Sequence, residues 1–257
     1  MKWILMAWTA ALAAAQTKAP AAVKKVPPLV EELVVANHIL AREGVLDAYG
    51  HVSVRDPANP NRFWLARHMA AGTVTASDII EYDLDSKPVN GDASAGYTER
   101  FIHGEIYRAR PDVMAIVHCH SPDLIPFGVA SVPLRPVFHM AGFLEVPVPV
   151  FDIREAAGMT DMLIRNPELG KALAKTLGQR PAALMRGHGA VVVAPGLHVV
   201  VGRAYYMNMN ARLQWQAMTL AAGGQVKYLD PEEAQKTGAQ DGFERAWDYW
   251  KQQAAGK

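Results

Sequence analysis

Two histidines of this 257-residue sequence are spaced as metal ligands on a β-strand would be. His118 and His120 follow the short apolar run 113–117, which predicts a buried strand. Side chains two residues apart on a strand point to the same face, so both imidazoles can converge on one ion. Cys119, between them, points to the opposite face and is expected to be a small buried residue rather than a ligand.

A third histidine stands at the end of another expected strand. His188 lies between Gly187 and Gly189, and glycines at such a turn allow close backbone approach and leave the imidazole open to a site. Three neutral imidazoles with an open fourth position are typical of a catalytic divalent-metal site, and Zn, Mn and Co all fit such a donor set. Spacing alone also permits the alternative that these are core or loop histidines that never meet.

A carboxylate precedes the first two histidines along the chain. Glu99 lies at the start of a helix expected over residues 98–109, which Pro111 prevents from continuing. The helix, the proline and the following strand form a hairpin-like unit that could return Glu99 to the vicinity of His118. A carboxyl group beside a metal can act as a general acid or base. The alternative role is a charge that stabilises the helix N-terminus.

The rest of the chain alternates expected helices and strands. This interleaving predicts a layered α/β domain over residues 29–253, and no linker-like composition divides that range. Helices are expected over 29–43, 98–109, 122–129, 166–177, 197–222 and 231–253. Strands are expected over 52–54, 62–66, 79–82, 113–117, 146–150, 183–185 and 190–193.

The N-terminus has a different composition. Lys2, an apolar stretch over residues 3–11 and a small-residue site at 13–15 together predict a signal peptide over residues 1–15, followed by a disordered lead-in over 16–28. The segment is too short for a stable transmembrane span, so no membrane association is expected after cleavage. This predicts an exported, periplasmic protein. If residues 1–15 instead form a helix packed on the domain, the protein would be cytoplasmic.

The overall composition excludes several classes of function. Lys and Arg number 26 and Asp and Glu 25, for a formal charge of +1, which gives no basis for a nucleic-acid partner. The one cysteine rules out an internal disulfide framework and a cysteine-based zinc cluster.

Together the motifs resemble a known family. The segment YTERFIHGEIYRARPDVMAIVHCHSP, with RGHG downstream, resembles the class II aldolase/adducin family over roughly residues 30–224. The resemblance implies a three-layer α/β/α sandwich around a mixed, mostly antiparallel sheet, and a homotetramer with active sites between subunits. It implies metal ligation by His118, His120 and His188 and acid/base catalysis by Glu99. Adducin-type members, a non-catalytic alternative, lack these histidines.

The sequence departs from the sugar-phosphate aldolases where those enzymes hold phosphate. Their G-N-x-S turn is here Gly50-His51-Val52-Ser53, their T-G turn is replaced around Arg67-His68-Met69, and their Ser-Ser pair is Tyr97-Thr98. A phosphate favours small hydroxyl and backbone donors. An arginine fork favours a planar carboxylate, so these positions predict a small-molecule carboxylate substrate unless bulky residues merely fill the former pocket. The predicted substrate contacts are His51, Ser53, Arg67, His68, Tyr97 and Thr98.

A further position points in the same direction. His139 lies where the aldolases carry a tyrosine that serves the neighbouring subunit, and it is expected to be a second proton donor. This pattern resembles the family's decarboxylase branch, which acts on hydroxy-carboxy-muconic semialdehydes and hydroxyaromatic carboxylates. The resemblance predicts a metal-dependent carbon–carbon lyase that decarboxylates a hydroxylated or oxo-carboxylic acid through a metal-stabilised enolate. An aldolase or epimerase acting on a sugar or sugar phosphate is the alternative.

Overall fold

The computed structural model describes residues 27–89, 96–144, 146–239 and 242–255. The predicted signal peptide and all of the lead-in up to residue 26 lie outside this part of the chain. The described helices are α1 (Pro28–Arg42), α2 (Arg100–Ala109), α3 (Ile125–Val129), α4 (Ile153–Ala157), α5 (Pro167–Leu177), α6 (Leu197–Leu220), α7 (Pro231–Gly238) and α8 (Glu244–Ala254). The described strands are β1 (His51–Arg55), β2 (Arg62–Ala66), β3 (Ile79–Asp83), β4 (Ala115–Cys119), β5 (Val150–Phe151), β6 (Ala182–Met185) and β7 (Gly189–Ala194).

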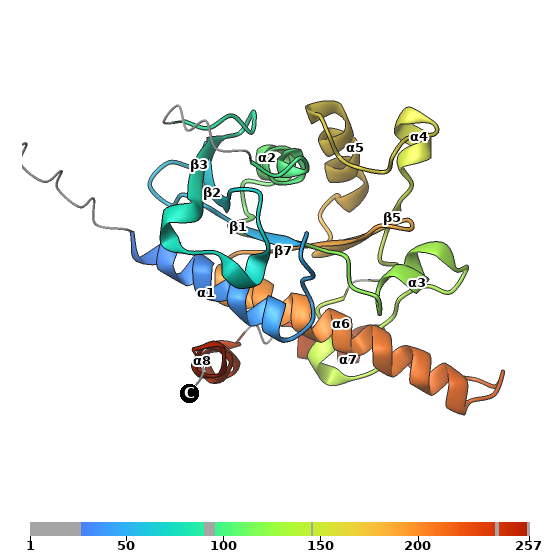
Figure 1. The fold of residues 1–257 in the computed structure, drawn as a ribbon. Helices are drawn as coiled ribbons and strands as arrows, with labels where there is room; N and C mark the ends of the chain where they lie inside the picture. Colours follow the sequence, from blue (N-terminus) through green and yellow to red (C-terminus); the bar gives the residue numbers. More distant parts are fainter. Residues whose placement is uncertain (1–26, 90–95, 145, 240–241, 256–257) are drawn as a thin grey trace, which may run out of the picture.

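The strands form one seven-stranded sheet in the order β3-β2-β1-β4-β7-β6-β5. Each pair of neighbours is antiparallel except β5 and β6, which are parallel. Helices α1, α6 and α8 lie on one side of the sheet and α2, α4 and α5 on the other (Figure 1). The expected α/β/α sandwich with a mixed, mostly antiparallel sheet is therefore confirmed.

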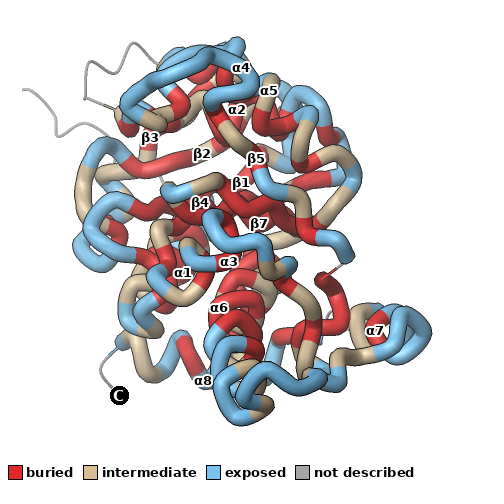
Figure 2. The backbone as a smooth tube through the Cα atoms, turned by 90° about the vertical axis from the view of Figure 1, so that its right-hand side faces the viewer, coloured by how far each residue is buried: buried red, intermediate tan, exposed pale blue. Residues whose placement is uncertain are grey.

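Two hydrophobic cores follow from alternation along the strands. In β4, Val117 and Cys119 belong to the core under α1 and α6, whereas Ile116 belongs to the core under α2 and α5. Successive strand residues face opposite sides, so a strand covered on both faces, such as β7, can be apolar throughout. Figure 2 shows the resulting pattern, with buried residues along the strands and exposed residues on the outer surface. Among the described helices, none has the length and hydropathy of a transmembrane span.

Four predicted elements differ most from those observed. The strand expected over 113–117 lies instead at Ala115–Cys119, so it includes His118. The strand expected over 146–150 is only Val150–Phe151, because Pro147 and Pro149 lack the N–H groups that a sheet requires. The helix expected over 122–129 begins only at Ile125, with Pro126 in its first turn. The single helix expected over 231–253 is two helices, α7 and α8. Where α7 ends, Gly238 lies so close to the backbone of Gly142 that a side chain there would collide with it.

Candidate active site

Two antiparallel strands bring the three histidines together. His118 is the penultimate residue of β4, His120 follows the end of that strand, and His188 immediately precedes β7, which pairs with β4. A side chain at Gly189 would collide with the carbonyl oxygen of Cys119, so only glycine allows the turn to approach the end of β4 so closely. Gly187, on the other side of His188, has a φ of 65°, in the left-handed region that favours glycine.

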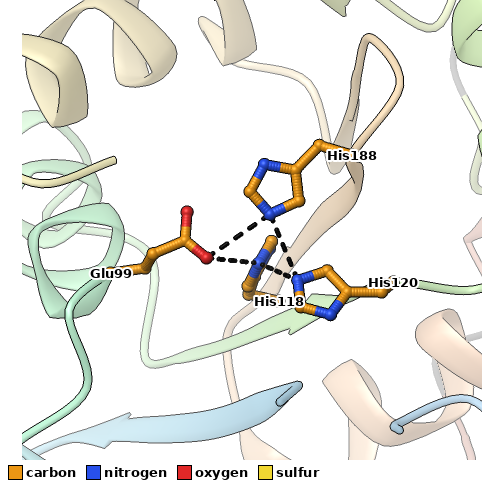
Figure 3. A group of neighbouring side chains, drawn as sticks. All are labelled: Glu99, His118, His120 and His188. Carbon is orange, nitrogen blue, oxygen red and sulfur yellow. Dashed lines mark hydrogen bonds and ion pairs between the residues drawn. The ribbon is translucent and has the colours of Figure 1, made fainter. Parts of the chain in front are cut away.

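The imidazoles meet through their Nε2 atoms. The Nε2 of His120 is 3.1 Å from the Nε2 of His118 and 3.1 Å from the Nε2 of His188 (Figure 3). The Oε2 atom of Glu99 is 3.4 Å from the Nε2 atoms of both His118 and His188. Ligand atoms at about 2.0–2.1 Å from a tetrahedral zinc ion are separated by roughly 3.3–3.4 Å. The two imidazole distances are close to that spacing, and all four atoms lie within 4.8 Å of one another, so the imidazoles can share one ion with Glu99 beside it.

Each imidazole is held through its other nitrogen. The Nδ1 atoms of His118 and His188 are 3.1 Å and 3.0 Å from the carbonyl oxygens of Ala190 and Met162. The Nδ1 of His120 is 3.2 Å from both carboxylate oxygens of Asp47. Carbonyl and carboxylate oxygens only accept hydrogen bonds, so each Nδ1 carries a proton and donates it. The three Nε2 lone pairs then face one another and require a positive charge between them, which fits a divalent metal ion.

Glu99 lies at the N-cap position of α2 and is 7% exposed. Its Oε1 accepts a hydrogen bond from the backbone N–H of Ile164 at 3.0 Å, which leaves Oε2 directed at the histidines. Burial raises its pKa, but when a proton instead of a metal ion occupies the cluster, hydrogen bonds and charge from His118 and His188 outweigh burial and hold the pKa of Glu99 well below its usual range. A cation in the cluster acts in the same direction, so Glu99 is ionised and can accept a proton.

The pKa of His188 also depends on the carboxylate of Glu99. Burial lowers the pKa of His188, but its hydrogen bond with Glu99 and the charge of that group outweigh burial, and the pKa lies above its usual value. The cluster therefore attracts positive charge whether it is supplied by a proton or by a metal ion.

Asp47 distinguishes His120 from the other two imidazoles. Its Oδ1 atom also accepts hydrogen bonds from the backbone N–H groups of Tyr49 and Gly50, at 2.9 and 2.8 Å, which fixes the carboxylate beside the ring. Asp47 is thus the one carboxylate in the described chain that hydrogen-bonds to the Nδ1 of a cluster histidine. Such a partner orients a ligand and raises its basicity.

We expect Asp47→Asn to weaken metal affinity by about 10- to 100-fold, because the amide keeps the turn but removes the charge next to His120. Competition against a chromophoric chelator measures the dissociation constant. Asp56→Asn is the matched control, since Asp56 also accepts a backbone hydrogen bond in a loop, from Ala58, but contacts no cluster histidine. Equal metal affinities of the two variants would contradict this role for Asp47.

The residues predicted to contact substrate lie at different depths. His51 is the cross-strand partner of His118, is 1% exposed, and has its ring 5.2 Å from the ring of His118 and 4.3 Å from that of Tyr97. Tyr97 is buried and its hydroxyl donates to the carbonyl oxygen of Met69. Ser53 is fully buried, and its hydroxyl contacts His103 and Tyr107, so it lies behind His51 rather than on a surface open to a ligand.

The remaining predicted contacts are exposed. The ring of His68 packs edge-on against Tyr97, at 5.8 Å, and Thr98 directly precedes Glu99. Arg67 forms a 2.7 Å ion pair with Asp78, and its side chain is 45% exposed. His139 is exposed on a short 3-10 helix that packs against α6 and α7, and no contact within the described chain joins it to the metal cluster.

Sequence reasoning missed three residues of the site. Asp47 orients His120, and His103 and Tyr107 continue the hydrogen bonds behind His51. A signal existed for His103, which lies four residues after Glu99 on the same helix and therefore on the same face. Asp47 carried no comparable signal, because it reaches His120 across 73 residues of sequence.

Stability should depend on pH through His103. Burial, then the charge of His118, lowers the pKa of His103 from its usual 6.5 to about 3, so the folded protein keeps this ring neutral. The unfolded chain binds a proton below about pH 6.5, so the stabilisation is complete above that pH and is lost as the pH falls toward 3.

For metal-free protein we expect the free energy of unfolding to fall by about 1.4 kcal/mol per pH unit per such histidine in this range. His51, whose pKa burial also lowers, acts in the same direction. Urea denaturation at about pH 7 and about pH 5 measures the slope. The His103→Gln variant, which lacks the titrating group, should show a smaller slope, and an identical one would contradict the assignment.

Comparison with known proteins identifies the family. Residues 31–215 match the family described as Class II Aldolase and Adducin N-terminal domain. The chain is 39% identical over 236 residues to decarboxylase tropJ of Talaromyces stipitatus, covering 83% of this chain and 89% of that protein. This protein belongs to the class II aldolase and adducin family.

Other members of the family support the same grouping. The 3,4-dihydroxyphthalate decarboxylase of Arthrobacter keyseri is 31% identical over 232 residues, covering 84% of this chain and 90% of that enzyme. Among solved structures, an aldolase II superfamily protein from Pseudomonas syringae aligns with a TM-score of 0.73 at 20% identity, covering 90% of this chain and 94% of that one. L-fuculose 1-phosphate aldolase from Glaciozyma antarctica aligns with a TM-score of 0.70 at 24% identity, covering 88% of each chain. The resemblance to the decarboxylase branch of the class II aldolase and adducin family is thus confirmed.

Proposed function

We propose that this protein is a divalent-metal-dependent carbon–carbon lyase that decarboxylates a hydroxylated aromatic or oxo-carboxylic acid. The observation that carries the proposal is the convergence of three Nε2 atoms with the ionised carboxylate of Glu99. Relatives named as decarboxylases, at 39% and 31% identity, favour carbon dioxide over an aldehyde as the departing fragment.

His118, His120 and His188 would hold the metal, which can be Zn, Mn or Co. When bound, a metal with three neutral ligands keeps its charge and supplies Lewis-acid stabilisation of negative charge that develops on substrate oxygens. The carboxylate of Asp47 fixes the ring of His120, and backbone carbonyls fix the other two rings.

Glu99 would move the proton that the reaction needs. Loss of carbon dioxide breaks a carbon–carbon bond and leaves an electron pair on the substrate carbon, which must take up a proton. As an ionised carboxylate fixed by the N–H of Ile164, Glu99 can accept the proton of a substrate hydroxyl and return it to that carbon. The exposed Arg67 and His68, with Thr98 beside Glu99, would bind the substrate carboxylate.

The test is a substrate screen with metal-loaded protein. Hydroxylated aromatic acids and sugar phosphates are supplied separately, and carbon dioxide and aldehyde are assayed in parallel. Carbon dioxide release from the acids alone supports the proposal. Aldehyde formation alone would overturn the choice of reaction and assign an aldolase.

We further propose a homotetramer in which His139 of one subunit donates a proton in a neighbour's active site. His139 is exposed, and no hydrogen bond, ion pair or ring contact of the described residues joins it to the metal cluster of its own chain, so it is free to serve a neighbouring subunit. Light scattering measures the assembly. Inactive Glu99→Gln and His139→Ala chains should recover partial activity when mixed subunits assemble, and no recovery would contradict shared sites.

We also propose that the protein is exported to the periplasm after removal of residues 1–15. N-terminal sequencing of the mature protein and cell fractionation test this. A mature chain that begins at Met1 in the cytoplasmic fraction would overturn it.

A further inference from the structure

Four buried polar side chains form a continuous hydrogen-bonded series behind the metal cluster. The hydroxyl of Tyr107 is 2.8 Å from Ser53 Oγ, which is 2.6 Å from His103 Nδ1. The Nε2 of His103 is in turn 2.8 Å from the Nδ1 of His51. Helix α2 supplies His103 and Tyr107, four residues apart, and β1 supplies His51 and Ser53, two apart, so each pair shares a face of its element. None of the four side chains is more than 1% exposed.

The direction of the hydrogen bonds follows from the terminal hydroxyl. Tyr107 has two acceptors within reach, Ser53 Oγ at 2.8 Å and the carbonyl oxygen of Met114 at the limiting distance of 3.5 Å. The Met114 carbonyl already accepts the backbone N–H of Arg55 at 2.8 Å, so we assign the Tyr107 proton to the shorter contact, as a donor to Ser53. Ser53 has one proton and donates it to Nδ1 of His103. His103 therefore carries its proton on Nε2 and donates it to Nδ1 of His51, and the proton of His51 lies on its own Nε2.

Both rings are neutral as well as oriented. Each ring uses one nitrogen as an acceptor, since Nδ1 of His103 accepts from Ser53 and Nδ1 of His51 accepts from His103, so each carries a single proton. No hydrogen bond of the described residues uses the Nε2 of His51. Because its Nδ1 faces His103, this Nε2 lies on the opposite side of a ring that stands 5.2 Å from the ring of His118.

We propose that His103 is a positioning residue that, with Ser53 and Tyr107, holds His51 as the neutral Nε2–H tautomer, and that His51 donates this N–H to a carboxylate oxygen of the substrate. The second part rests on the proposed decarboxylase function, whereas the first part rests on the hydrogen-bonded series and does not need that function. Decarboxylation consumes the negative charge of the carboxylate, so a second cationic partner beside Arg67 would further stabilise the starting state relative to the transition state. A neutral donor orients the group with less of this penalty.

The tautomer is measured directly on the zinc-loaded full chain labelled with 15N-histidine. Long-range 1H–15N correlation spectra show which ring nitrogen carries the proton. The expected result is an Nε2–H pattern for His51 and His103, opposite to the Nδ1–H pattern of the three cluster histidines. An Nδ1–H pattern for His51 would overturn the proposal, whatever the activity of the protein.

Variants then separate positioning from simple structural support. His103→Leu should give His51 mixed tautomers and lower kcat/KM for a hydroxylated aromatic acid by about 3- to 10-fold at unchanged metal content, the size of one hydrogen bond. His103→Gln keeps a donor toward His51 and should restore both properties. An unchanged tautomer in the leucine variant would overturn the role of His103.

The Tyr107→Phe variant provides a milder test should His103→Leu fail to fold. Ser53 can still donate to His103 in this variant, so His51 should keep its Nε2–H tautomer, and a switch to Nδ1–H would contradict the deduced direction. If no acid releases carbon dioxide, the proposed function fails while the tautomer measurement remains decisive for the hydrogen-bonded series.

Discussion

The His118→Ala variant is expected to fold but to lose its metal and its turnover together. His118 is fully buried in the middle strand of the sheet and supplies one of the three converging Nε2 atoms. Two imidazoles cannot complete the site, and the Lewis acid contributes several kcal/mol to the reaction. At about 1.4 kcal/mol per tenfold change in rate, turnover should fall by at least about 1000-fold.

Metal content by mass spectrometry and carbon dioxide release measure the two losses on the same preparation. His198→Ala is the control, since this partly exposed ring stacks on Trp247 at 4.1 Å, outside the cluster, and should leave both properties unchanged. Turnover that survives in metal-free His118→Ala protein would refute the assignment of the site.

The Glu99→Gln variant should differ from His118→Ala in its metal content: the metal should be retained while turnover is lost. Glutamine keeps a carbonyl oxygen that can accept the hydrogen bond from Ile164, and the three imidazoles remain. It cannot accept and return a proton, so kcat should fall by about 100- to 10,000-fold, the usual contribution of general acid–base catalysis.

The control for this variant is Glu105→Gln, on the same helix. Glu105 is similarly buried but lies 3.5 Å from Arg108 instead of at the metal cluster, so its replacement should leave kcat unchanged. If Glu99→Gln retained kcat within about threefold of the wild-type value, Glu99 would not carry the proton.

The convergence of His118 and His120 could be predicted from sequence because its geometry is local, whereas the approach of His188, 68 residues away, depends on the pairing of β4 with β7. Two residues on one strand share a face, which placed His118 and His120 together, and Cys119 indeed lies in the core on the other side of the sheet. A glycine-flanked histidine at a strand end supplied the third ligand. The resemblance to the family then predicted the layers of the fold, which no single segment reveals.

The surroundings of the site depend on long-range packing and could not be predicted in this way. Alternation places His51 and Ser53 on one face of β1, but only the docking of α2 decides that Ser53 is covered. That docking depends in turn on Gly170 of α5, where a side chain would meet the backbone of Phe101 and the side chain of Glu105. Asp47 contacts His120 from a loop distant in sequence, which no local pattern encodes.

The position of β4 in the sheet has a consequence for how the substrate range can change. With three strands on either side, β4 is the central strand of the sheet, and it contains His118 and ends immediately before His120. Arg67, His68 and Thr98, in contrast, lie on exposed segments. Under the proposed function, substitutions confined to these three positions should therefore change substrate preference while the cluster in the sheet keeps its metal.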